Sequence, residues 1–329
     1  MKINIRAIEK YLPGSPVDSL SMEKELGWKE GWTVKNTGVE TRHRAGVNET
    51  IATMGAHALT KTLNSAACKL SELDLLIYAG GSYDHPIPYN ACLIKHEVSK
   101  QHEPLACFDV DATCLSFLHA LDIAHLYLQS GRCKRIAIVS AELSSRSLNP
   151  KDPKTYSLFG DAAVAVILEA SANEGYTPGA AQFINYSDGA KLAIIPTGGL
   201  VNSGMDASTV KESYYFQMDG KKLIKFTQRT IDGFIENYEK AAGRKLKEYD
   251  FIVPHQPSKF GNDLFVKQFE LDPSKVIFNL PKYGNCISAS IPLGLEEIVK
   301  ENTSLKNKNL LLIGTAAGLS YGAIELKFV

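Results

Sequence analysis

Short apolar runs alternate with longer amphipathic stretches along this chain, which is the hydrophobic pattern of strands joined by helices. Apolar runs typical of buried strands occupy residues 72–80, 105–110, 135–140, 162–168, 248–256 and 309–314. Stretches with apolar residues at helical spacing occupy residues 49–70, 115–129, 221–245 and 287–297. Because parallel strands need a connection of this length, the order of elements predicts an α/β fold whose sheets are mostly parallel and covered by helices.

The same order of elements occurs twice, which predicts an internal duplication. Residues 72–80 resemble residues 248–256 in that each is a short apolar strand after an acidic turn. Each copy follows a long helical segment and precedes another helix, a second strand and a turn that starts a further helix. We therefore expect two halves related by a pseudo-twofold axis, residues 1–172 and 173–329, joined within the small polar stretch 170–175.

Cys114 stands where a predicted strand gives way to a helix. The strand at 105–110 breaks at 111–113, and the helix at 115–129 follows without Gly or Pro. Thr113 is the predicted N-cap. A cysteine in the first turn of a helix lies at the positive end of the helix dipole, which predicts a lowered pKa and a reactive thiolate beside free N–H groups. The alternative is an ordinary buried cysteine.

His255 and Asn285 lie at the ends of elements in the second half. His255 emerges where the strand at 250–254 becomes a loop, and Asn285 belongs to the Gly-Asn turn before the helix at 287–297. Taken singly, both have ordinary structural interpretations, since a Gly-Asn pair is a common turn. Ligands of open α/β sheets bind beyond the carboxyl ends of strands, so packing by the shared symmetry is expected to bring both residues to Cys114.

Composition narrows the class of function. The 329 residues carry 36 basic and 36 acidic side chains, so neither nucleic acid nor an anionic membrane is indicated as a partner. The six cysteines include no C-x-x-C pair, which argues against a disulfide framework and against a zinc site. Since no continuous apolar stretch reaches transmembrane length, we expect a cytoplasmic protein.

One long irregular region interrupts the regular pattern. Residues 196–220 hold several glycines and polar residues between the predicted strands and helices. A loop of this length in a compact domain more often has a function than not. We therefore expect it to cover an active site.

A set of short motifs resembles one enzyme family over nearly the whole chain. The motifs are Trp32 with Thr37-Gly-Val-Glu-Thr-Arg-His43, Asn48-Glu-Thr50 with Met54-Gly55, Phe108-Asp-Val-Asp-Ala-Thr-Cys114, Leu158-Phe-Gly-Asp161, Pro254-His-Gln256, Tyr283-Gly-Asn285 and residues 314–322. In this order they resemble the β-ketoacyl-acyl-carrier-protein synthase III branch of the thiolase superfamily. The resemblance implies a thiolase-like five-layered αβαβα fold, a homodimer, and a catalytic triad of Cys114, His255 and Asn285.

The chemistry that the resemblance implies has two half-reactions. The Cys114 thiolate attacks an acyl thioester of coenzyme A or of an acyl carrier protein, and the backbone N–H groups of Cys114 and Ala317 form the oxyanion hole. A malonyl thioester then loses carbon dioxide, and His255 and Asn285 donate to its enolate oxygen, which requires a proton on His255 Nε2. The carbanion attacks the acyl group on Cys114. Coenzyme A or phosphopantetheine thioesters are the substrates, and no metal or cofactor is implied.

The mouth of the implied site departs from the family pattern. Trp32 matches the aromatic residue that packs on the adenine of coenzyme A, but Asn36 and Pro153 replace the two arginines that accompany it. The loss of two cations favours an acyl carrier protein as the donor, or a different pose of coenzyme A. Phe260 stands where relatives have an arginine that docks the acidic carrier protein, with Lys259 next to it.

Two further departures concern the acyl pocket and the glycine-rich loop. Ile87 falls where many relatives place a phenylalanine that closes the pocket from across the dimer, so it predicts a deeper pocket for medium-length or branched acyl chains. The alternative is that Ile87 only repacks an interface. The loop reads Gly314-Thr-Ala-Ala-Gly318 where relatives have three consecutive glycines, so its two alanines supply N–H groups only in conformations open to non-glycine residues.

The sequence leaves several functions open. The leading hypothesis is a decarboxylating condensing enzyme, in fatty-acid initiation or, as Asn36, Pro153 and Ile87 favour, in a specialised polyketide-like pathway such as an alkylquinolone or alkylresorcinol route. Acyl transfer to an oxygen or nitrogen nucleophile is the second, although Asn285 argues against it because an enolate site needs two donors. A degradative thiolase would need a second reactive cysteine, and Cys286 is interpreted as packing. A non-catalytic partner subunit that binds an acyl carrier is the last alternative.

Overall fold

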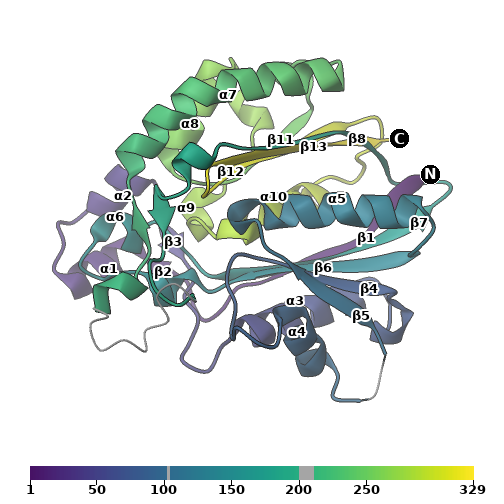
Figure 1. The fold of residues 1–329 in the computed structure, drawn as a ribbon, viewed down its shortest axis with the longest axis horizontal. Coiled ribbons are helices and arrows are strands. Elements are labelled where there is room, and N and C mark those ends of the chain that lie inside the picture. Colours follow the sequence, from purple (N-terminus) through teal and green to yellow (C-terminus); the bar gives the residue numbers. More distant parts are fainter. Residues whose placement is uncertain (102–103, 200–210) are drawn as a thin grey trace.

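Helices and sheets alternate in five layers in the computed structural model, which describes residues 1–101, 104–199 and 211–329 (Figure 1). The longer helices are α3 (Ile51–Ser65), α4 (Asn90–Val98), α5 (Ser116–Gln129), α7 (Gly220–Ala242), α8 (Lys259–Gln268) and α10 (Ser290–Glu301). Helices α7 and α8 form one outer layer, α5 and α10 form the central layer, and α3 and α4 form the other outer layer. This arrangement confirms the expected αβαβα fold.

Two sheets lie between the helical layers. Their strands are β1 (Lys2–Tyr11), β4 (Leu75–Ala79), β5 (Ala106–Val110), β6 (Arg135–Glu142), β7 (Ala162–Ser171), β8 (Tyr176–Asn185), β11 (Phe251–Pro254), β12 (Asn309–Ala316) and β13 (Ser320–Phe328). Hydrogen bonds connect them in the order β11-β12-β13-β8-β1-β7-β6-β4-β5. The pair Ile3 and Tyr176 joins β1 to β8 at the start of both strands. The sheets diverge from this point into separate layers (Figure 1).

The prediction of mostly parallel sheets is wrong. β4 pairs in parallel with β5 and β6, and β11 pairs in parallel with β12. The pairs β1–β7, β6–β7, β12–β13 and β8–β13 are antiparallel. Residues 317–319 alone separate β12 from β13, so the chain returns in a hairpin rather than through a crossover helix. An apolar run indicates a buried strand but not its direction, which explains the error.

Short elements gather mostly at one end of the layers (Figure 1). They are β2 (Val17–Asp18), α1 (Ser19–Leu26), α2 (Trp32–Thr37), β3 (Thr41–Arg42), α6 (Pro153–Tyr156), β9 (Ala193–Ile194), β10 (Gln217–Met218) and α9 (Leu280–Tyr283). The first turn of α5 lies at the same end of the layers as most of these elements.

Matching elements of the chain repeat the same local interactions. The N–H of Asp74, before β4, donates to the carbonyl of Arg135, and the N–H of Asp250, before β11, donates to the carbonyl of Asn309. The counterpart of β5 is reduced to a parallel bridge at Val276, which pairs with β11. The repeated interactions place the ends of β4 and β11 in equivalent surroundings.

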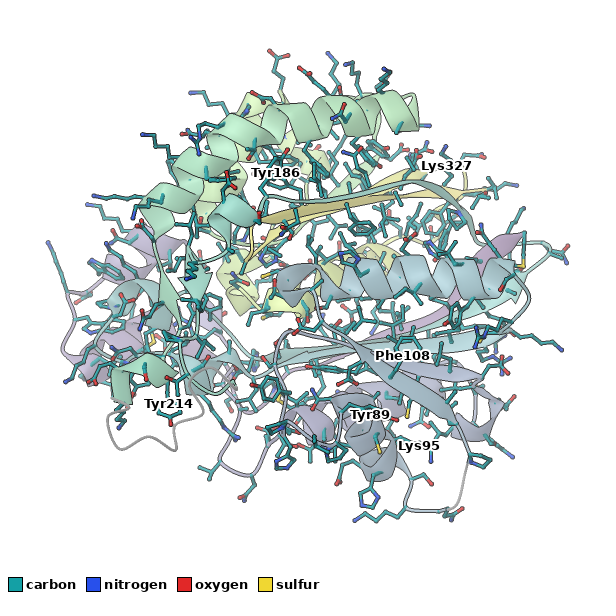
Figure 2. The ribbon with its side chains drawn as sticks, viewed as in Figure 1. Tyr89, Lys95, Phe108, Tyr186, Tyr214 and Lys327 are labelled. Atoms are coloured by element: carbon teal, nitrogen blue, oxygen red, sulfur yellow. The ribbon has the colours of Figure 1, made fainter. Side chains whose placement is uncertain are left out.

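The central helix α5 is buried on the face that its sequence predicts. Its apolar residues at helical spacing are at most 1% exposed: Leu118, Leu121, Ala124 and Leu128. His125 is also buried and shares a hydrogen bond of 2.8 Å with the hydroxyl of Tyr176. Figure 2 shows side chains filling the space between the layers, and Phe108 of β5 packs against this core. Because the helix is held by both sheets, its first turn is a fixed support for Cys114.

Candidate active site

The turn that carries Cys114 is not capped as predicted. A 3₁₀ turn, Thr113–Leu115, precedes α5, and Thr113 has a φ of +51°. The N–H of Thr113 donates to Asp111 Oδ1 at 2.8 Å, and the N–H of Ala112 donates to Ser116 Oγ at 2.9 Å. Thr113 is therefore not the N-cap, because its neighbours satisfy the free N–H groups. A left-handed backbone is uncommon for a β-branched residue and is typical of functional turns.

The turn before α10 repeats this geometry in the second half of the chain. Ile287 starts a 3₁₀ turn with a φ of +49°. Its N–H donates to Asn285 Oδ1 at 2.9 Å, and the N–H of Cys286 donates to Ser290 Oγ at 3.0 Å. Asn285 thus occupies the position that Asp111 has in the first half. Two β-branched residues with the same unusual φ show that the duplication extends to the loops of the site.

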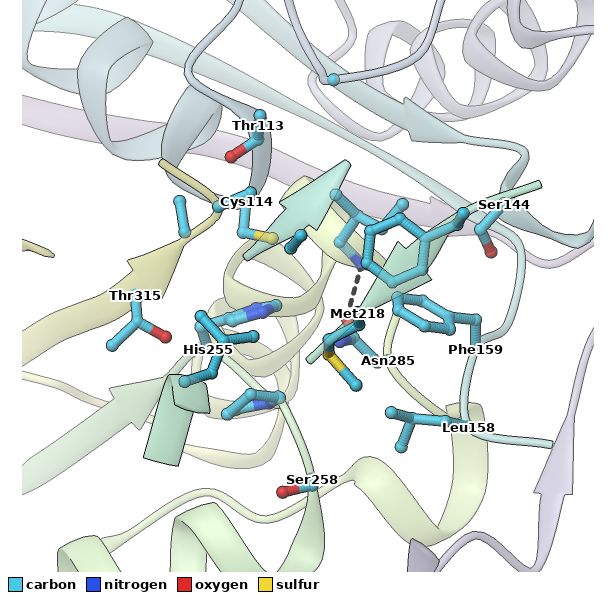
Figure 3. Close-up of a pocket in the computed structure, with 18 of the residues that line it drawn as sticks. Thr113, Cys114, Ser144, Leu158, Phe159, Met218, His255, Ser258, Asn285 and Thr315 are labelled. Carbon is cyan, nitrogen blue, oxygen red and sulfur yellow. Dashed lines mark hydrogen bonds between the residues drawn. The ribbon is translucent and has the colours of Figure 1, made fainter. Parts of the chain in front are cut away.

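The hydrogen bond from Ile287 fixes the orientation of the Asn285 amide (Figure 3, dashed line). Since Oδ1 accepts this bond, Nδ2 is left as the donor that faces the cavity. The backbone of Asn285 is held as well, because its N–H donates to the Leu158 carbonyl at 2.9 Å and its carbonyl accepts from the N–H of Gly160 at 3.1 Å. Hydrogen bonds therefore hold both the backbone of Asn285 and the amide oxygen of its side chain.

Two glycines allow the chain segments beside Asn285 to cross closely. A Cβ atom on Gly160 would lie 2.1 Å from the carbonyl oxygen of Tyr283, and one on Gly284 would lie 2.7 Å from the carbonyl oxygen of Leu158. Gly284 also has a φ of +69°. Neither site leaves room for a side chain.

Replacing Gly160 with alanine should strongly destabilise the fold. The obstructing atom belongs to the backbone, which cannot turn aside as a side chain can, so we expect a loss of about 3 kcal/mol in the free energy of unfolding. The matched control is Gly233→Ala in α7, where no atom lies within 4 Å and alanine should add about 0.5–1 kcal/mol. Urea unfolding followed by circular dichroism measures both changes. Equal stability of the two variants would contradict the close crossing.

His255 follows the last residue of β11 and continues its pairing, because its N–H donates to the carbonyl of Ile313 at 2.8 Å. The residue is 3% exposed, and burial lowers the pKa of its imidazole to about 4, so the ring is neutral near pH 7. Nδ1 is buried and has no hydrogen-bond partner among the described residues. A proton on Nδ1 would be an unpaired buried donor, which favours the tautomer with its proton on Nε2.

The glycine-rich loop supplies N–H groups in conformations that suit alanine. Neither alanine of the loop has a positive φ, and Gly318 takes the left-handed value of +125°. The backbone N–H groups of Ala317 and Cys114 form hydrogen bonds to the Cys114 thiol that lower its pKa. Gly314 begins the loop, and a Cβ atom there would lie 2.9 Å from that of His255. The loop thus packs tightly against both residues.

Cys114, His255 and Asn285 lie on the wall of one cavity of about 1090 Å³ (Figure 3). This volume is at the upper end of the usual range for small-molecule sites. The cavity extends from the triad to side chains of α7 and α8. Its apolar lining includes Leu143, Leu148, Leu158, Phe159, Phe216, Ile224, Leu264 and Phe265. Its size and lining suit an extended, largely apolar group.

The pKa of Cys114 is shifted in the direction opposite to the prediction. Burial, together with the negative charge of Glu142, raises the pKa of the thiol to about 12. The N–H groups at the start of the helix act in the predicted direction, but they do not offset the loss of water around the sulfur. At neutral pH the resting protein therefore holds a thiol rather than a thiolate.

Trp32 and the two residues predicted beside it lie away from this cavity. Trp32 begins α2, and its ring packs against Trp28 with a centroid distance of 6.2 Å. Asn36 Nδ2 donates to the carbonyl of Trp32 at 2.6 Å, so the amide is engaged within its own helix. Pro153 begins α6. Because none of the three residues lines the cavity of Cys114, the coenzyme A contact expected at its mouth stays a prediction.

Apolar residues form the rim of the cavity where relatives were expected to be basic. Phe260 lines the cavity and is 58% exposed, whereas the neighbouring Lys259 forms an ion pair with Asp263 at 2.5 Å. Ile194 and Met218 are also exposed and line the cavity from the paired strands β9 and β10. This part of the cavity rim is apolar, whereas the exposed Arg146, Gln228 and Gln268 line the cavity elsewhere.

The irregular region predicted at 196–220 contributes to the cavity wall in its described parts. Thr197 and Tyr214 both line the cavity, and their segments flank β10 and follow β9. Residues 200–210 of the predicted covering loop lie outside the described residues. The part of the loop that can be placed is next to the site.

Ile87 is 86% exposed and does not line the cavity of the single chain. Tyr83 and Tyr89 on either side of it are 55% and 46% exposed. Tyr89 contacts Cys107 of β5, with 3.6 Å between its hydroxyl and the sulfur. An apolar surface thus lies beside β5, which is an edge strand of its sheet.

Two other reactive side chains near the triad are engaged by the fold. Asp161 is 1% exposed and accepts hydrogen bonds from the N–H of Ala45 at 2.8 Å and from the N–H and hydroxyl of Ser145 at 2.9 and 2.6 Å. Cys286 is fully buried and lies off the cavity wall. Both residues hold the loops in place.

The sequence analysis missed Glu142, a fully buried carboxyl group close to the site. The strand predicted to end at residue 140 continues to Glu142 as β6. A carboxylate directly after a buried apolar strand was the signal that could have revealed it, because a buried charge needs a specific environment. The contribution of α7 and α8 to the cavity was also missed, and the apolar faces of both helices were the available sign.

Across residues 1–101, 104–199 and 211–329, no group of His, Cys, Asp and Glu side chains is arranged to hold a metal ion. No helix in these parts of the chain is long and apolar enough to cross a membrane.

Comparison with known proteins identifies the family. Residues 108–195 match the profile of 3-oxoacyl-[acyl-carrier-protein (ACP)] synthase III, and residues 240–328 match its C-terminal profile. The chain is 33% identical over 318 residues to β-ketoacyl-[acyl-carrier-protein] synthase III of Blochmanniella floridana and 31% identical over 318 residues to that of Neisseria meningitidis, with 97% of each chain covered. The crystal structure of 3-oxoacyl-[acyl-carrier-protein] synthase III from Aquifex aeolicus has a TM-score of 0.86 at 27% identity and 99% coverage of both chains. The chain belongs to the β-ketoacyl-acyl-carrier-protein synthase III family.

Proposed function

We propose that this protein is an acyl-thioester condensing enzyme, which loads an acyl group on Cys114 and then joins it to a malonyl thioester with loss of carbon dioxide. The observation that carries the proposal is the common cavity of Cys114, His255 and Asn285. Among the described residues no hydrogen bond engages the Nδ2 donor of Asn285, whose Oδ1 accepts from Ile287, and the proton of His255 is favoured on Nε2. Membership of the synthase III family supports the same reaction.

In the loading step the sulfur of Cys114 attacks the carbonyl carbon of an acyl thioester. The N–H groups of Cys114 and Ala317, which already contact the sulfur, would hold the oxyanion of the tetrahedral intermediate. A new carbon–sulfur bond forms, the bond to the donor sulfur breaks, and the donor leaves as a thiol with the proton of Cys114. Because burial raises the pKa of Cys114, loss of this proton accompanies the attack rather than preceding it.

In the condensing step the carboxylate of a malonyl thioester leaves as carbon dioxide. The enolate oxygen accepts hydrogen bonds from Nε2–H of His255 and Nδ2–H of Asn285, and its carbon attacks the acyl group on Cys114. The carbon–sulfur bond to Cys114 then breaks, and the sulfur takes up a proton from solvent, which restores the thiol. The lowered pKa of His255 fits this role, since a neutral ring keeps the Nε2 proton throughout. The hydrogen bond from Ile287 to Asn285 fits it as well, because it keeps the acceptor oxygen of the amide away from the enolate.

We propose an acyl carrier protein as the principal acyl donor. Trp32 and Asn36 do not line the cavity, and Phe260 makes the nearby rim apolar, so the adenine and phosphates of coenzyme A find few partners there. Exposed lysines of α7 and α8, Lys222 and Lys267, lie on the helices beside the cavity and suit an acidic protein. Coenzyme A or phosphopantetheine thioesters act as substrates, and we propose that no metal or further cofactor takes part.

We also propose a homodimer joined beside β5. An edge strand with an exposed apolar surface is a ready site for a second chain, and Tyr83, Ile87 and Tyr89 supply that surface. In such a dimer Ile87 would approach the acyl pocket of the other subunit. We further propose that the two halves of the chain divide between residues 172 and 173. We also propose that the protein is cytoplasmic and that it serves a specialised pathway.

Among acyl donors of graded length, those with a medium-length or branched acyl chain should load Cys114 best. The reason is the isoleucine at position 87 together with the long apolar wall of the cavity. Intact-mass measurement after incubation with acyl-coenzyme A and acyl-carrier thioesters gives the profile, with Cys114→Ala as the control. An acetyl-only profile would contradict the proposed pocket. An equal mass gain on the control would contradict the proposed nucleophile.

Release of carbon dioxide separates condensation from plain acyl transfer. A transferase acting on an oxygen or nitrogen nucleophile, or a non-catalytic partner subunit, would not decarboxylate malonyl thioester. Asn285 opposes both alternatives, because a second fixed donor serves an enolate oxygen and has no role in either.

A further inference from the structure

A buried carboxyl group without a cation lies next to the proposed nucleophile. Glu142 ends β6 and is fully buried. Its Oε1 accepts from the N–H of Gly81 at 2.8 Å and lies 2.5 Å from Ser288 Oγ, and its Oε2 accepts from Ser82 Oγ at 2.5 Å. Burial and the hydrogen bonds from Ser288, Ser82 and Gly81 shift its pKa, and no ion pair with Glu142 is present among the described residues. The mechanism described above makes no use of this residue.

The hydrogen-bond geometry around Ser288 fits the neutral form of Glu142. The hydroxyl of Ser288 lies 2.5 Å from Glu142 Oε1 and 3.0 Å from the carbonyl oxygen of Ala79. A hydroxyl has one hydrogen, so it cannot donate fully to both acceptors. If Glu142 carries a proton, its O–H donates to Ser288 Oγ, and Ser288 donates to Ala79. Every polar atom in this chain of contacts then has a partner.

The place of Glu142 in the duplicated fold relates it directly to the nucleophile. The turns before α5 and α10 match residue by residue, so Ser288 occupies the position of Cys114. Strands β6 and β12 match as well, so Glu142 occupies the position of Ala316 beside the oxyanion loop. In the duplicated fold, Glu142 thus corresponds to Ala316 of the oxyanion loop, and Ser288 corresponds to Cys114, the proposed nucleophile.

Glu142 also supports the loop that packs on the nucleophile turn. Gly81 and Ser82 line the cavity, and both donate to the carboxyl group. A Cβ atom on Gly81 would lie 3.1 Å from Cα of Thr113, the residue before Cys114. The carboxyl group therefore holds a loop against the backbone that positions the sulfur. Ser82 lines the cavity and its hydroxyl donates to Glu142, so Ser82 connects the carboxyl group to the cavity.

The charge of Glu142 acts on three titratable groups that face it from different elements. Burial is the main cause that raises the pKa of Tyr78 on β4, of Cys114 before α5 and of Cys286 before α10, and the charge of Glu142 raises all three in the same direction. Burial raises the pKa of Glu142 itself to about 7. The carboxyl group and the Cys114 thiol are therefore coupled, since a negative charge on either one opposes a negative charge on the other.

We propose that Glu142 is a positioning residue for acyl loading, which as a neutral acid holds the loop of Gly81 and Ser82 against the Cys114 turn and permits negative charge on the sulfur. Its ionisation opposes that charge and slows loading. The inference rests on the proposed role of Cys114 as the nucleophile. Glu142 gains and loses no proton in the loading step itself, because the proton of Cys114 leaves with the donor thiol.

The test is the pH dependence of Cys114 alkylation by iodoacetamide in the full-length protein, followed by peptide mass measurement. At pH 6 the wild type and Glu142→Gln should react alike, because Glu142 is neutral in the wild type. At pH 9 Glu142→Gln should react about tenfold faster, since removal of a nearby negative charge lowers a thiol pKa by about one unit. A structural role alone predicts the same ratio at every pH.

A second variant keeps the carboxyl group and guards against misfolding of the first. Ser82→Ala removes a donor to Oε2 that lowers the pKa of Glu142, so the carboxyl group stays neutral to higher pH and alkylation at pH 8 should rise severalfold. Glu296→Gln, at another buried carboxyl group paired with Lys10, is the matched control and should leave the profile unchanged. Parallel profiles for the wild type, Glu142→Gln and Ser82→Ala would overturn the inference.

Acyl loading of the wild type separates this inference from the proposed function. If an acyl donor leaves no mass on Cys114 at any pH, the proposed function fails. If loading occurs and its pH dependence is the same in Glu142→Gln, the proposed function stands and the role of Glu142 fails. Faster loading of Glu142→Gln above pH 7, with equal loading at pH 6, supports both.

Discussion

Replacing Cys114 with alanine should abolish covalent acylation and reduce condensation by on the order of 10⁴-fold or more. The cavity wall holds this sulfur beside the N–H of Ala317, whereas Cys286 is fully buried and off the wall. Decarboxylation of a malonyl thioester should continue in the variant, because His255 and Asn285 keep their places. Intact mass, product formation and carbon dioxide release measure the three outcomes.

The matched control for this experiment is Cys286→Ala. It removes the sulfur nearest in sequence to Asn285 and should leave acylation of Cys114 intact, with some loss of stability from the cavity it creates. Acylation that persists in Cys114→Ala but disappears in Cys286→Ala would reverse the assignment of the nucleophile.

Much of the fold could be predicted because burial and periodicity agree along most of the chain. The helix expected at 115–129 is α5, and the strand expected at 162–168 is β7, which extends to Ser171. β8 was not predicted, since its sequence contains Pro178 and Gly179 and has no clear alternation. It forms a strand because β13 pairs with it along nearly its whole length. Partner strands far away in sequence decide such cases.

The site was predictable in its residue types but not in its electrostatics. A cysteine at a helix start predicts a low pKa only if the rest of the protein leaves it near water. Burial and Glu142 reverse the sign of the shift, and neither follows from the local sequence around Cys114. Thr113 shows the same limit, because the preference of threonine for caps does not reveal that its N–H donates to Asp111 and that its backbone is left-handed.

The turns before α5 and α10 match more closely in structure than their sequences indicate. The sequence comparison set the Cys114 turn against the turn at Asn285, whereas the structure aligns Cys114 with Ser288 and Asn285 with Asp111. The shared features are a left-handed residue and a side-chain acceptor two positions before it, which different residue types provide. Duplicated folds can therefore keep a loop geometry after its sequence has diverged, and each half has put it to a different use.

Replacing Asn285 with aspartate should reduce malonyl decarboxylation by about 10²- to 10³-fold while acylation of Cys114 persists. Aspartate keeps an acceptor oxygen for the N–H of Ile287, so the turn before α10 should retain its geometry. The second oxygen replaces the Nδ2 donor and repels the enolate instead of donating to it. Carbon dioxide release gives the first rate, and intact mass gives the second.

The duplication supplies a matched control for that substitution. Asp111→Asn makes the reverse exchange at the equivalent position, where the side chain accepts from Thr113 at 2.8 Å and does not line the cavity. It should leave decarboxylation within about twofold of the wild type, since it adds no donor to the site. If Asn285→Asp and Asp111→Asn lowered the rate equally, the shared turn geometry would be the cause. If only Asn285→Asp lowers it, the amide donor itself acts on the enolate, and two turns of one shape differ in function by one nitrogen atom.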